Sequence, residues 1–121
     1  MQINNLVLIT GASQGIGRAI ATRVIQDGYR VINLDKKAPK NLLEGETYHS
    51  IDLMDPQAIE ELIPKITKQE PILRLVNNAG FIRPGALENT TLDDFEAVMA
   101  LNLRAPMLLA QQLLPHMRQA K

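Results

Sequence analysis

The stretch that most constrains the fold lies near the start of the chain, where an apolar run passes directly into a glycine-rich segment. Leu6 to Ile9 are consecutive apolar residues, which is typical of a parallel strand covered on both faces. Gly11, Gly15 and Gly17 follow, and we expect a helix to begin at about Gly15. Glycine lets an anion approach the backbone closely, and a helix N-terminus offers free N–H groups. The stretch therefore predicts an anion site that a dinucleotide pyrophosphate would fit.

A second strand is predicted over Val31 to Leu34, and it ends at Asp35. The helix between the strands, from Gly15 to Asp27, repeats apolar residues every four positions, and Gly28 is suited to cap it. Asp35 follows Gly17 by 18 residues, close to the spacing at which an acid binds the adenosine ribose of a dinucleotide. A carboxylate there repels a 2′-phosphate, so Asp35 favours NAD over NADP. The alternative is an ordinary exposed aspartate at a strand end.

The segment after Asp35 predicts a second part of the same site. Ala38 to Glu46 are polar and too short for a full crossover helix, so we expect a loop or a single helical turn. Thr47 to Ile51 predict a third strand, which is less apolar and therefore nearer the sheet edge. An adenine ring could lie against Asp52, which would accept from its amino group, and the backbone of Leu53. Alternatively, Asp52 is a loop or capping aspartate.

Two further elements follow. Asp55-Pro56 is typical of a helix start, with Asp as the N-cap and Pro in the first helical position, and Pro64 should kink this helix. Ile72 to Val76 predict a fourth strand that runs into Asn77-Asn78-Ala79-Gly80. Because ligands of open α/β sheets bind at the carboxyl ends of the strands, these residues are candidates for the site.

The last predicted helix runs from Thr91 to about Met117, with Asp93 and Asp94 favourably placed in its first turn. Its apolar residues cover more than one side, which predicts burial by the sheet and by a second subunit. Pro106 lacks the N–H that would bond to the carbonyl of Asn102. We therefore expect a local kink and a free main-chain acceptor; the alternative is a tolerated kink with water on that carbonyl.

Composition excludes several function classes. Lys+Arg and Asp+Glu number 13 each and aromatic residues make up 3%, so nothing draws the chain to nucleic acid or to an anionic membrane. The absence of cysteine excludes disulfides and thiolate metal sites and fits a reducing cytoplasm. We expect no signal peptide and no membrane span. His49 and His116 have no partners at ligand spacing, so we predict no metal site.

Taken together, these motifs resemble the classical short-chain dehydrogenase/reductase family over all 121 residues. The glycine turn and the Asn-Asn-Ala-Gly run, in this order and at this separation, make the resemblance specific. It implies a Rossmann-type doubly wound parallel sheet, and this chain would hold about four of its strands, in the order 3-2-1-4, with flanking helices. The resemblance is carried by Thr10 to Gly17, Asp35, Asp52-Leu53, Asn77 to Gly80 and Asn102.

The resemblance also implies a cofactor and roles for these residues. In the family the glycine turn binds the pyrophosphate side of NAD(P), the acid matching Asp35 selects NAD, and Asp52-Leu53 meets adenine. Asn78 to Gly80 line a ribose, and Asn102 belongs to the catalytic set, where its carbonyl holds a water in a proton relay. The implied cofactor-binding residues are Gly11, Ser13, Gln14, Gly15, Ile16, Gly17, Asp35, Asp52, Leu53, Asn78, Ala79 and Gly80.

Part of the family's machinery has no counterpart in this sequence. The family uses a serine, and a tyrosine followed four residues later by a lysine, to move the substrate proton; no serine or tyrosine occurs after Ser50. We therefore expect residues 1–121 to be the N-terminal part of one NAD(P)-binding domain, inactive alone, with a bare apolar edge at strand four. The parent enzyme would act on a secondary alcohol or ketone. The alternative is a non-catalytic nucleotide-binding or self-associating module.

Overall fold

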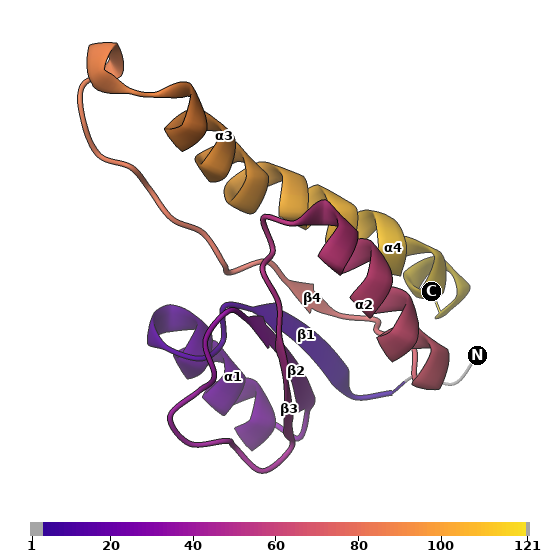
Figure 1. Ribbon diagram of the computed structural model, residues 1–121. Coiled ribbons are helices and arrows are strands. Elements are labelled where there is room, and N and C mark those ends of the chain that lie inside the picture. Colours follow the sequence, from indigo (N-terminus) through magenta and orange to yellow (C-terminus); the bar gives the residue numbers. More distant parts are fainter. Residues whose placement is uncertain (1–3, 121) are drawn as a thin grey trace.

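The computed structural model describes residues 4–120, which form a four-stranded parallel sheet with helices on both faces (Figure 1). The strands are β1 (Leu6–Thr10), β2 (Arg30–Asp35), β3 (Glu46–Ser50) and β4 (Leu75–Val76). Their order in the sheet is β3-β2-β1-β4, and every pair is parallel. This confirms the predicted Rossmann-type sheet and the place of β3 at its edge.

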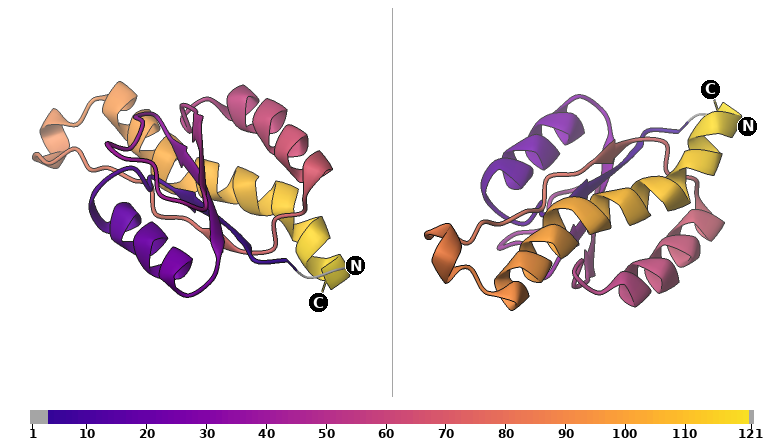
Figure 2. Two further views of the ribbon diagram at one scale, coloured as in Figure 1. Left: turned by 90° about the horizontal axis from the view of Figure 1, so that it is seen from below. Right: turned by 90° about the horizontal axis from the view of Figure 1, so that it is seen from above.

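The helices divide between the two faces of the sheet, as Figure 2 shows. On one face lies α1 (Gly15–Gln26), and on the other lie α2 (Pro56–Gln69) and α4 (Ala105–Ala120). A connection without helix joins β2 to β3, as its length predicted. Among residues 4–120 we find no helix with the length and apolar character that a membrane span requires.

Side chains of β1 alternate between two hydrophobic cores because successive residues of a strand point to opposite faces. Leu6 and Leu8 pack with α2 and α4, whereas Val7 and Ile9 pack with α1. All four are buried. The apolar run that opens the chain is therefore covered on both faces, as predicted.

The predicted helix boundaries in the first half of the chain are confirmed. Asp55 caps α2, and its Oδ1 accepts hydrogen bonds from the N–H groups of Gln57 (3.1 Å) and Ala58 (3.4 Å). Gly28 follows the C-cap of α1 with φ +96°, a left-handed conformation that favours glycine. The helix α2 continues through Pro64 as one element, and the kink expected there stays a prediction.

The fourth strand is much shorter than the predicted range of 72–76. Only Leu75 and Val76 pair with β1, although the N–H of Leu8 also donates to the carbonyl of Arg74 (3.0 Å). At the start of β1 the hydrogen bonds to β4 do not continue, because the N–H of Leu6 donates instead to the side-chain oxygen Oδ1 of Asn4 (3.2 Å). The predicted bare edge is also less exposed than expected, since Leu75 and Val76 are half-buried.

The predicted final helix is in fact three elements. After a short 3₁₀ turn, η1 (Leu87–Asn89), the chain forms α3 (Leu92–Met99), a π-helical stretch η2 (Ala100–Arg104) and then α4. In η2 the N–H of Ala105 bonds to the carbonyl of Ala100, five residues back. The wider turn directly precedes Pro106, whose ring crowds the carbonyl four residues earlier. The sequence predicted a local distortion at this position, and the structure has one there, in the form of a π-helical stretch.

The start of α3 matches the prediction. Oγ1 of Thr91 accepts a hydrogen bond from the N–H of Asp94 (3.0 Å), and Asp93 and Asp94 occupy the first turn. The segment 81–91 leads away from the sheet to this helix, and α3 and α4 together form the long rod in Figure 1.

Candidate functional site

A cavity of about 340 Å³ opens at the carboxyl ends of the strands. Its wall includes five residues that the sequence analysis singled out, which come from four separate segments of the chain. They are Gly11, Asp35, Asp52, Leu53 and Ala79. Strands that are far apart in the sequence thus bring the predicted residues together, as expected for the carboxyl edge of a parallel sheet.

The glycine turn is tightly packed against the end of β4. Gly11 has φ +68°, and an added Cβ on Gly17 would lie 2.1 Å from the carbonyl oxygen of Gly11. Nδ2 of Asn78 donates to the carbonyls of Thr10 and Gly11, both at 3.1 Å. Oγ1 of Thr10 accepts from the N–H groups of Asn78 (3.0 Å) and Ala79 (2.9 Å). Asn78 therefore fixes the shape of the turn through its side chain.

The N-terminus of α1 is open to solvent. Gln14 is its N-cap residue and makes no side-chain capping hydrogen bond, and the first turn contains no acidic residue. Gln14, Gly15 and Ile16 are exposed, and Ile16 is 76% exposed. The positive end of the helix dipole is thus left uncompensated beside the turn, which is the environment that the predicted anion site requires.

The carboxylate of Asp35 is held in a fixed orientation at the end of β2. Its Oδ2 accepts from the N–H of Ser13 and its Oδ1 from the N–H of Lys37, both at 3.1 Å. Oγ of Ser13 donates to the carbonyl of Lys37 (2.6 Å), and the Tyr48 hydroxyl donates to the carbonyl of Asp35 (3.2 Å). Each carboxylate oxygen keeps a second lone pair for an external donor.

Asp52 and Leu53 form the next part of the wall. Asp52 is exposed, and its Oδ1 accepts from the N–H of Met54 (3.0 Å), so it also has the local turn role that the sequence left open. The side chain of Leu53 is 6% exposed and belongs to the core shared with α2 and α4. An external group at this point would meet a carboxylate at the surface and an apolar surface beneath it.

Asn102 lies in η2, next to the cavity wall that Leu101 contributes. Its amide forms two hydrogen bonds with the backbone of Phe81: Oδ1 accepts from the N–H (3.0 Å), and Nδ2 donates to the carbonyl (2.7 Å). A Cβ on Gly80 would lie 2.8 Å from Oδ1 of Asn102. The side chain of Asn102 thus joins the distorted helix to the segment that follows Asn78 to Gly80.

Several wall residues were not found from the sequence. Phe81 and Arg83 come from the loop after Gly80, where only tertiary structure brings them to the cavity. The Arg83 guanidinium lies 5.0 Å from the centre of the Phe81 ring and forms an ion pair with Asp94 (3.4 Å). No sequence pattern signals these contacts. The remaining wall residues that were missed are Leu34, Lys36, Ile51, Met54 and Leu101.

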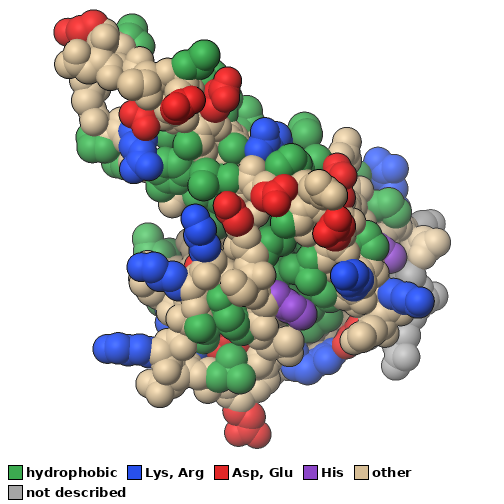
Figure 3. All heavy atoms as spheres, in the orientation of Figure 1, with side chains coloured by type: hydrophobic (Ala, Val, Ile, Leu, Met, Phe, Trp, Pro, Cys, Tyr) green, Lys and Arg blue, Asp and Glu red, His purple; other side chains and the backbone are tan. Residues whose placement is uncertain are grey.

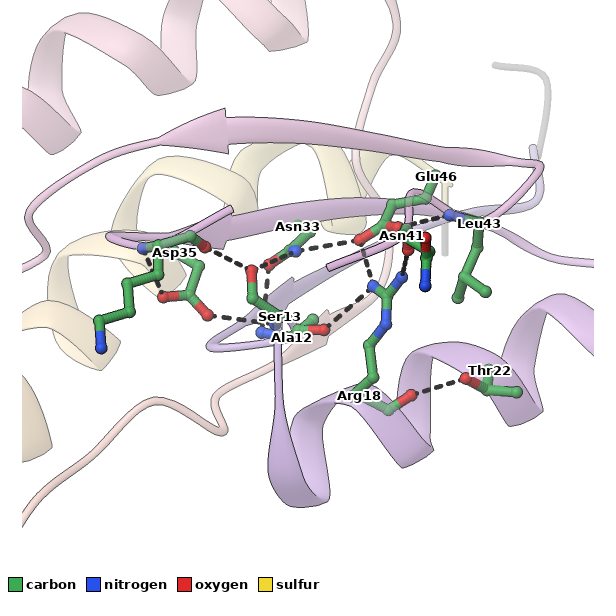
Figure 4. A network of polar contacts seen from close by, with 10 residues as sticks. Ala12, Ser13, Arg18, Thr22, Asn33, Asp35, Asn41, Leu43 and Glu46 are labelled. Carbon is green, nitrogen blue, oxygen red and sulfur yellow. Dashed lines mark hydrogen bonds and ion pairs between the residues drawn. The ribbon is translucent and has the colours of Figure 1, made fainter. Parts of the chain in front are cut away.

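A buried polar cluster behind the glycine turn was also missed. It joins Arg18 of α1, Asn33 of β2 and Glu46 of β3, and Figure 4 shows how their side chains converge. One signal was available, because Asn33 is a lone polar residue within the apolar run Val31 to Leu34. Within residues 4–120 we find no group of three or more His, Asp or Glu side chains that could hold a metal ion.

Comparison with known proteins places this geometry in a family. A model of the short chain dehydrogenases matches residues 5–121. The chain belongs to the short-chain dehydrogenase family. Its relatives include the benzil reductase ((S)-benzoin forming) of Bacillus cereus, which is 34% identical over 129 aligned positions that cover 95% of this chain and 51% of that protein. The chain thus spans about half the length of the curated relatives it matches.

Solved structures of the family share the fold. A short-chain dehydrogenase from Streptomyces avermitilis superposes with a TM-score of 0.90 at 31% identity, covering 98% of this chain and 46% of that one. A short-chain dehydrogenase from Leptospira borgpetersenii, solved with bound NAD+, gives a TM-score of 0.88 at 27% identity, covering 97% and 47%. The arrangement of β1, α1 and β2 is therefore that of an NAD(P)-binding oxidoreductase family.

Proposed function

We propose that this chain is the NAD-binding part of a dehydrogenase or reductase that transfers a hydride between NAD(H) and a secondary alcohol or ketone. The observation that carries the proposal is the Asp35 carboxylate. It lines the cavity at the end of β2, and both of its oxygens are oriented by backbone N–H groups of Ser13 and Lys37. A carboxylate held in this way accepts hydrogen bonds from the two hydroxyls of an adenosine ribose.

The rest of the cavity and its surroundings suit the remaining parts of NAD. The uncapped N-terminus of α1 would hold the pyrophosphate beside the glycine turn. Asp52 and Leu53 would meet the adenine, with Asp52 accepting from its amino group. Ala79 and Gly80 would line the second ribose, at the side of the cavity nearest Asn102. The proposed cofactor residues are those that the sequence predicted: Gly11, Ser13, Gln14, Gly15, Ile16, Gly17, Asp35, Asp52, Leu53, Asn78, Ala79 and Gly80.

Asp35 also supports a preference for NAD over NADP. A 2′-phosphate about 4 Å from its carboxylate would be repelled by on the order of 4 kcal/mol at an effective dielectric constant of about 20. Lys36, which lines the cavity, and Lys37 would offset part of this repulsion. The Asp35 carboxylate already has two hydrogen bonds in place, so it has little freedom to turn away from such a phosphate.

We further propose that residues 1–121 act as the N-terminal part of one domain, in the cytoplasm, and that Asn102 contributes its main-chain carbonyl to a proton relay. By itself the chain would bind NAD without turning over an alcohol. The long rod of α3, η2 and α4 supports a homo-oligomer, because it exposes large apolar side chains at intervals of three, four or seven residues. Figure 3 shows hydrophobic side chains at the surface over α3, among acidic and basic ones. This exposed apolar stripe consists of Leu92, Phe95, Met99, Leu103, Met107 and Leu114.

A second candidate function is a non-catalytic module that binds a nucleotide or associates with itself, and the exposed apolar stripe is the observation that favours it. The two candidates differ in the reaction that they predict. Hydride transfer between NAD(H) and an alcohol or ketone by a longer polypeptide that contains this chain supports the first candidate, and the absence of transfer by such a polypeptide supports the second.

Calorimetric titration of the chain with NAD+ and NADP+ tests the cofactor assignment. We expect the wild-type chain to bind NAD+ more tightly, and Asp35→Ala to move the ratio of the two dissociation constants at least tenfold toward NADP+. Asp27→Ala is the matched control, because Asp27 is an exposed aspartate at the opposite end of α1. An unchanged ratio in Asp35→Ala, or no binding of either dinucleotide by the wild type, would contradict the proposal.

A further inference from the structure

The acid Glu46 has an unusual position for a charged residue. It begins β3, and its side chain has 0% exposure. Its Oε2 accepts hydrogen bonds from Arg18 (2.7 Å) and from Nδ2 of Asn33 (3.0 Å), and its Oε1 accepts from the N–H of Leu43 (2.9 Å). Burial raises the pKa of the Glu46 carboxyl, but these hydrogen bonds and the Arg18 charge outweigh it and hold the pKa below its ordinary value. Glu46 is therefore a buried carboxylate with three donors directed at it.

The two side chains that bind Glu46 also bind a single residue of the glycine turn. Oδ1 of Asn33 accepts from the N–H of Ala12 (3.1 Å), while Arg18 donates to the carbonyl of Ala12 (3.3 Å). Ala12 is thus fixed on both sides, at its N–H and at its C=O. Because the same Glu46 oxygen binds Asn33 and Arg18, it sets the distance between these two supports (Figure 4).

The network continues from Ala12 to the ribose side of the proposed site. Nδ2 of Asn33 donates to Oγ of Ser13 (3.0 Å), and Ser13 in turn donates its N–H to Asp35 and its Oγ to the carbonyl of Lys37. A continuous chain of hydrogen bonds therefore connects Glu46 to the Asp35 carboxylate. In the part of the chain that the structure describes, no buried side-chain nitrogen or oxygen lacks a hydrogen-bond partner.

Arg18 supports the turn in this network, and the structure does not offer it as a phosphate ligand. It lies in the first turn of α1, close to the proposed pyrophosphate position, but its side chain is only 19% exposed. Its guanidinium is committed to Glu46, to Ala12 and to the carbonyl of Asn41 in the connection between β2 and β3. Glu46 thereby also anchors that connection to α1.

We propose that Glu46 is a positioning residue for dinucleotide binding, which acts through Asn33 and Arg18 to hold the Ala12–Ser13 segment and the Asp35 carboxylate in one fixed geometry. This inference rests on the proposed function. A buried ion pair contributes little to stability compared with apolar packing, whereas a fully satisfied polar network rigidifies its surroundings. A site that is already ordered loses less freedom when the ligand binds, so its affinity is higher.

Glu46→Gln tests this role, because it keeps the size of the side chain but removes its charge and replaces one acceptor oxygen by an NH2 donor, so the side chain can no longer accept from Arg18, Asn33 and the N–H of Leu43 as the carboxylate does. We expect its dissociation constant for NAD+ to rise roughly tenfold, and hydrogen exchange at the Ala12 amide to become faster in the ligand-free chain. Glu44→Gln is the matched control, since Glu44 is an exposed acid two residues earlier, and both quantities should stay as in the wild type. All titrations use temperatures at which circular dichroism shows each variant to be folded.

A double-mutant cycle separates positioning from a general loss of stability. Asn33→Ala removes the acceptor for Ala12 and should also raise the dissociation constant roughly tenfold. Because both residues act through one network, the double variant Glu46→Gln/Asn33→Ala should be weakened about tenfold and not a hundredfold. If Glu46→Gln does not fold, Asn33→Ala alone gives both measurements, the dissociation constant for NAD+ and the rate of hydrogen exchange at the Ala12 amide.

The outcomes distinguish this inference from the proposed function. Wild-type affinity for NAD+ together with unchanged Ala12 exchange in both variants would overturn the inference and leave the proposed function standing. Additive losses in the double variant would also overturn it. No binding of NAD+ by the wild type would overturn the proposed function and, with it, the affinity role of Glu46.

Discussion

The side-chain amide of Asn102 and the backbone of Phe81 form a closed pair of hydrogen bonds, 3.0 Å at Oδ1 and 2.7 Å at Nδ2. The two residues are 21 positions apart, and they join the π-helical stretch η2 to the loop that leaves the sheet after β4. Together with the ion pair between Arg83 and Asp94, this pair links the start of the segment 81–91 to the helical rod.

Asn102→Ala should release that segment. Each of the two hydrogen bonds contributes about 0.5–1.5 kcal/mol net, so we expect a loss of about 1–2 kcal/mol in the free energy of unfolding at this exposed position. Limited proteolysis followed by mass spectrometry should show faster cleavage within residues 81–91. Asn89→Ala changes an exposed asparagine in the same region and is the control. Equal cleavage rates in the two variants would show that Phe81 is held by other contacts.

Gly17→Ala should disrupt the glycine turn. The added Cβ would lie 2.1 Å from the carbonyl oxygen of Gly11 and 2.4 Å from Nδ2 of Asn78, and the first of these is a backbone atom that cannot move alone. We expect a destabilisation of about 3 kcal/mol or more, measured by urea unfolding. Ala19→Gly, at an exposed position of the same helix, should lower stability by only about 1 kcal/mol. A Gly17→Ala variant as stable as Ala19→Gly would mean that the turn can open without penalty.

Local signals in the sequence were sufficient for much of this fold. The cap at Asp55, the turn at Gly28 and the alternation around Leu8 each depend on residues within a few positions of one another. The position of Asp35 at the cavity follows from the strand order, because β1 and β2 are adjacent and parallel and so end at the same edge. These features could therefore be predicted before the tertiary structure was known.

The features that were missed depend on contacts between distant segments. β4 is short partly because Asn4 supplies its side chain to Leu6, and Arg74 bonds to the carbonyl of Asn4 (2.7 Å), 70 residues away. The side-chain partners of Glu46 lie 13 and 28 residues before it, on a neighbouring strand and on α1. No periodicity or capping pattern encodes such pairs, which is why the support behind the glycine turn appeared only in the structure.

Acid should weaken the fold through two carboxylates. Burial raises the pKa of Glu46, but its three hydrogen bonds and the Arg18 charge more than reverse the effect; the hydrogen bond from Arg30 lowers the pKa of Glu70. Both pKa values are lower in the folded chain than in the unfolded chain, where the pKa of a glutamate is about 4.3. The unfolded state therefore binds more protons as the pH falls below that value, so the stabilisation is complete above it and is lost toward the folded pKa values.

The prediction is checked by urea unfolding at several pH values between about 3 and 5, which gives the free energy of unfolding as a function of pH. We expect a positive slope in the wild type and a smaller slope in Glu46→Gln, since that variant cannot titrate at this position. Glu70→Gln should reduce the slope less, because the Glu70 side chain is 34% exposed and water screens its pairing with Arg30. If Glu46→Gln keeps the full wild-type slope, the acid sensitivity comes from other groups.

The exposed apolar stripe makes a prediction about assembly, which rests on the proposed homo-oligomer. Phe95 is 53% exposed and Leu103 is 59% exposed, and they lie on α3 and η2 with Met99 between them. Removing apolar surface from water lowers the free energy by about 25 cal/mol for each Å². A dimer in which a second copy covers the stripe would therefore be stabilised by this burial. A charge placed in the middle of the stripe would have to be buried without a partner, which opposes that contact.

We therefore expect Phe95→Glu and Leu103→Glu to shift the chain toward the monomer in analytical ultracentrifugation. Gln119→Glu is the control, because it adds the same charge at an exposed position of α4 outside the stripe, and it should leave the mass distribution unchanged. A wild-type chain that sediments as a monomer of 13.5 kDa at every concentration would refute the assembly, and association that survives both substitutions would place the interface elsewhere.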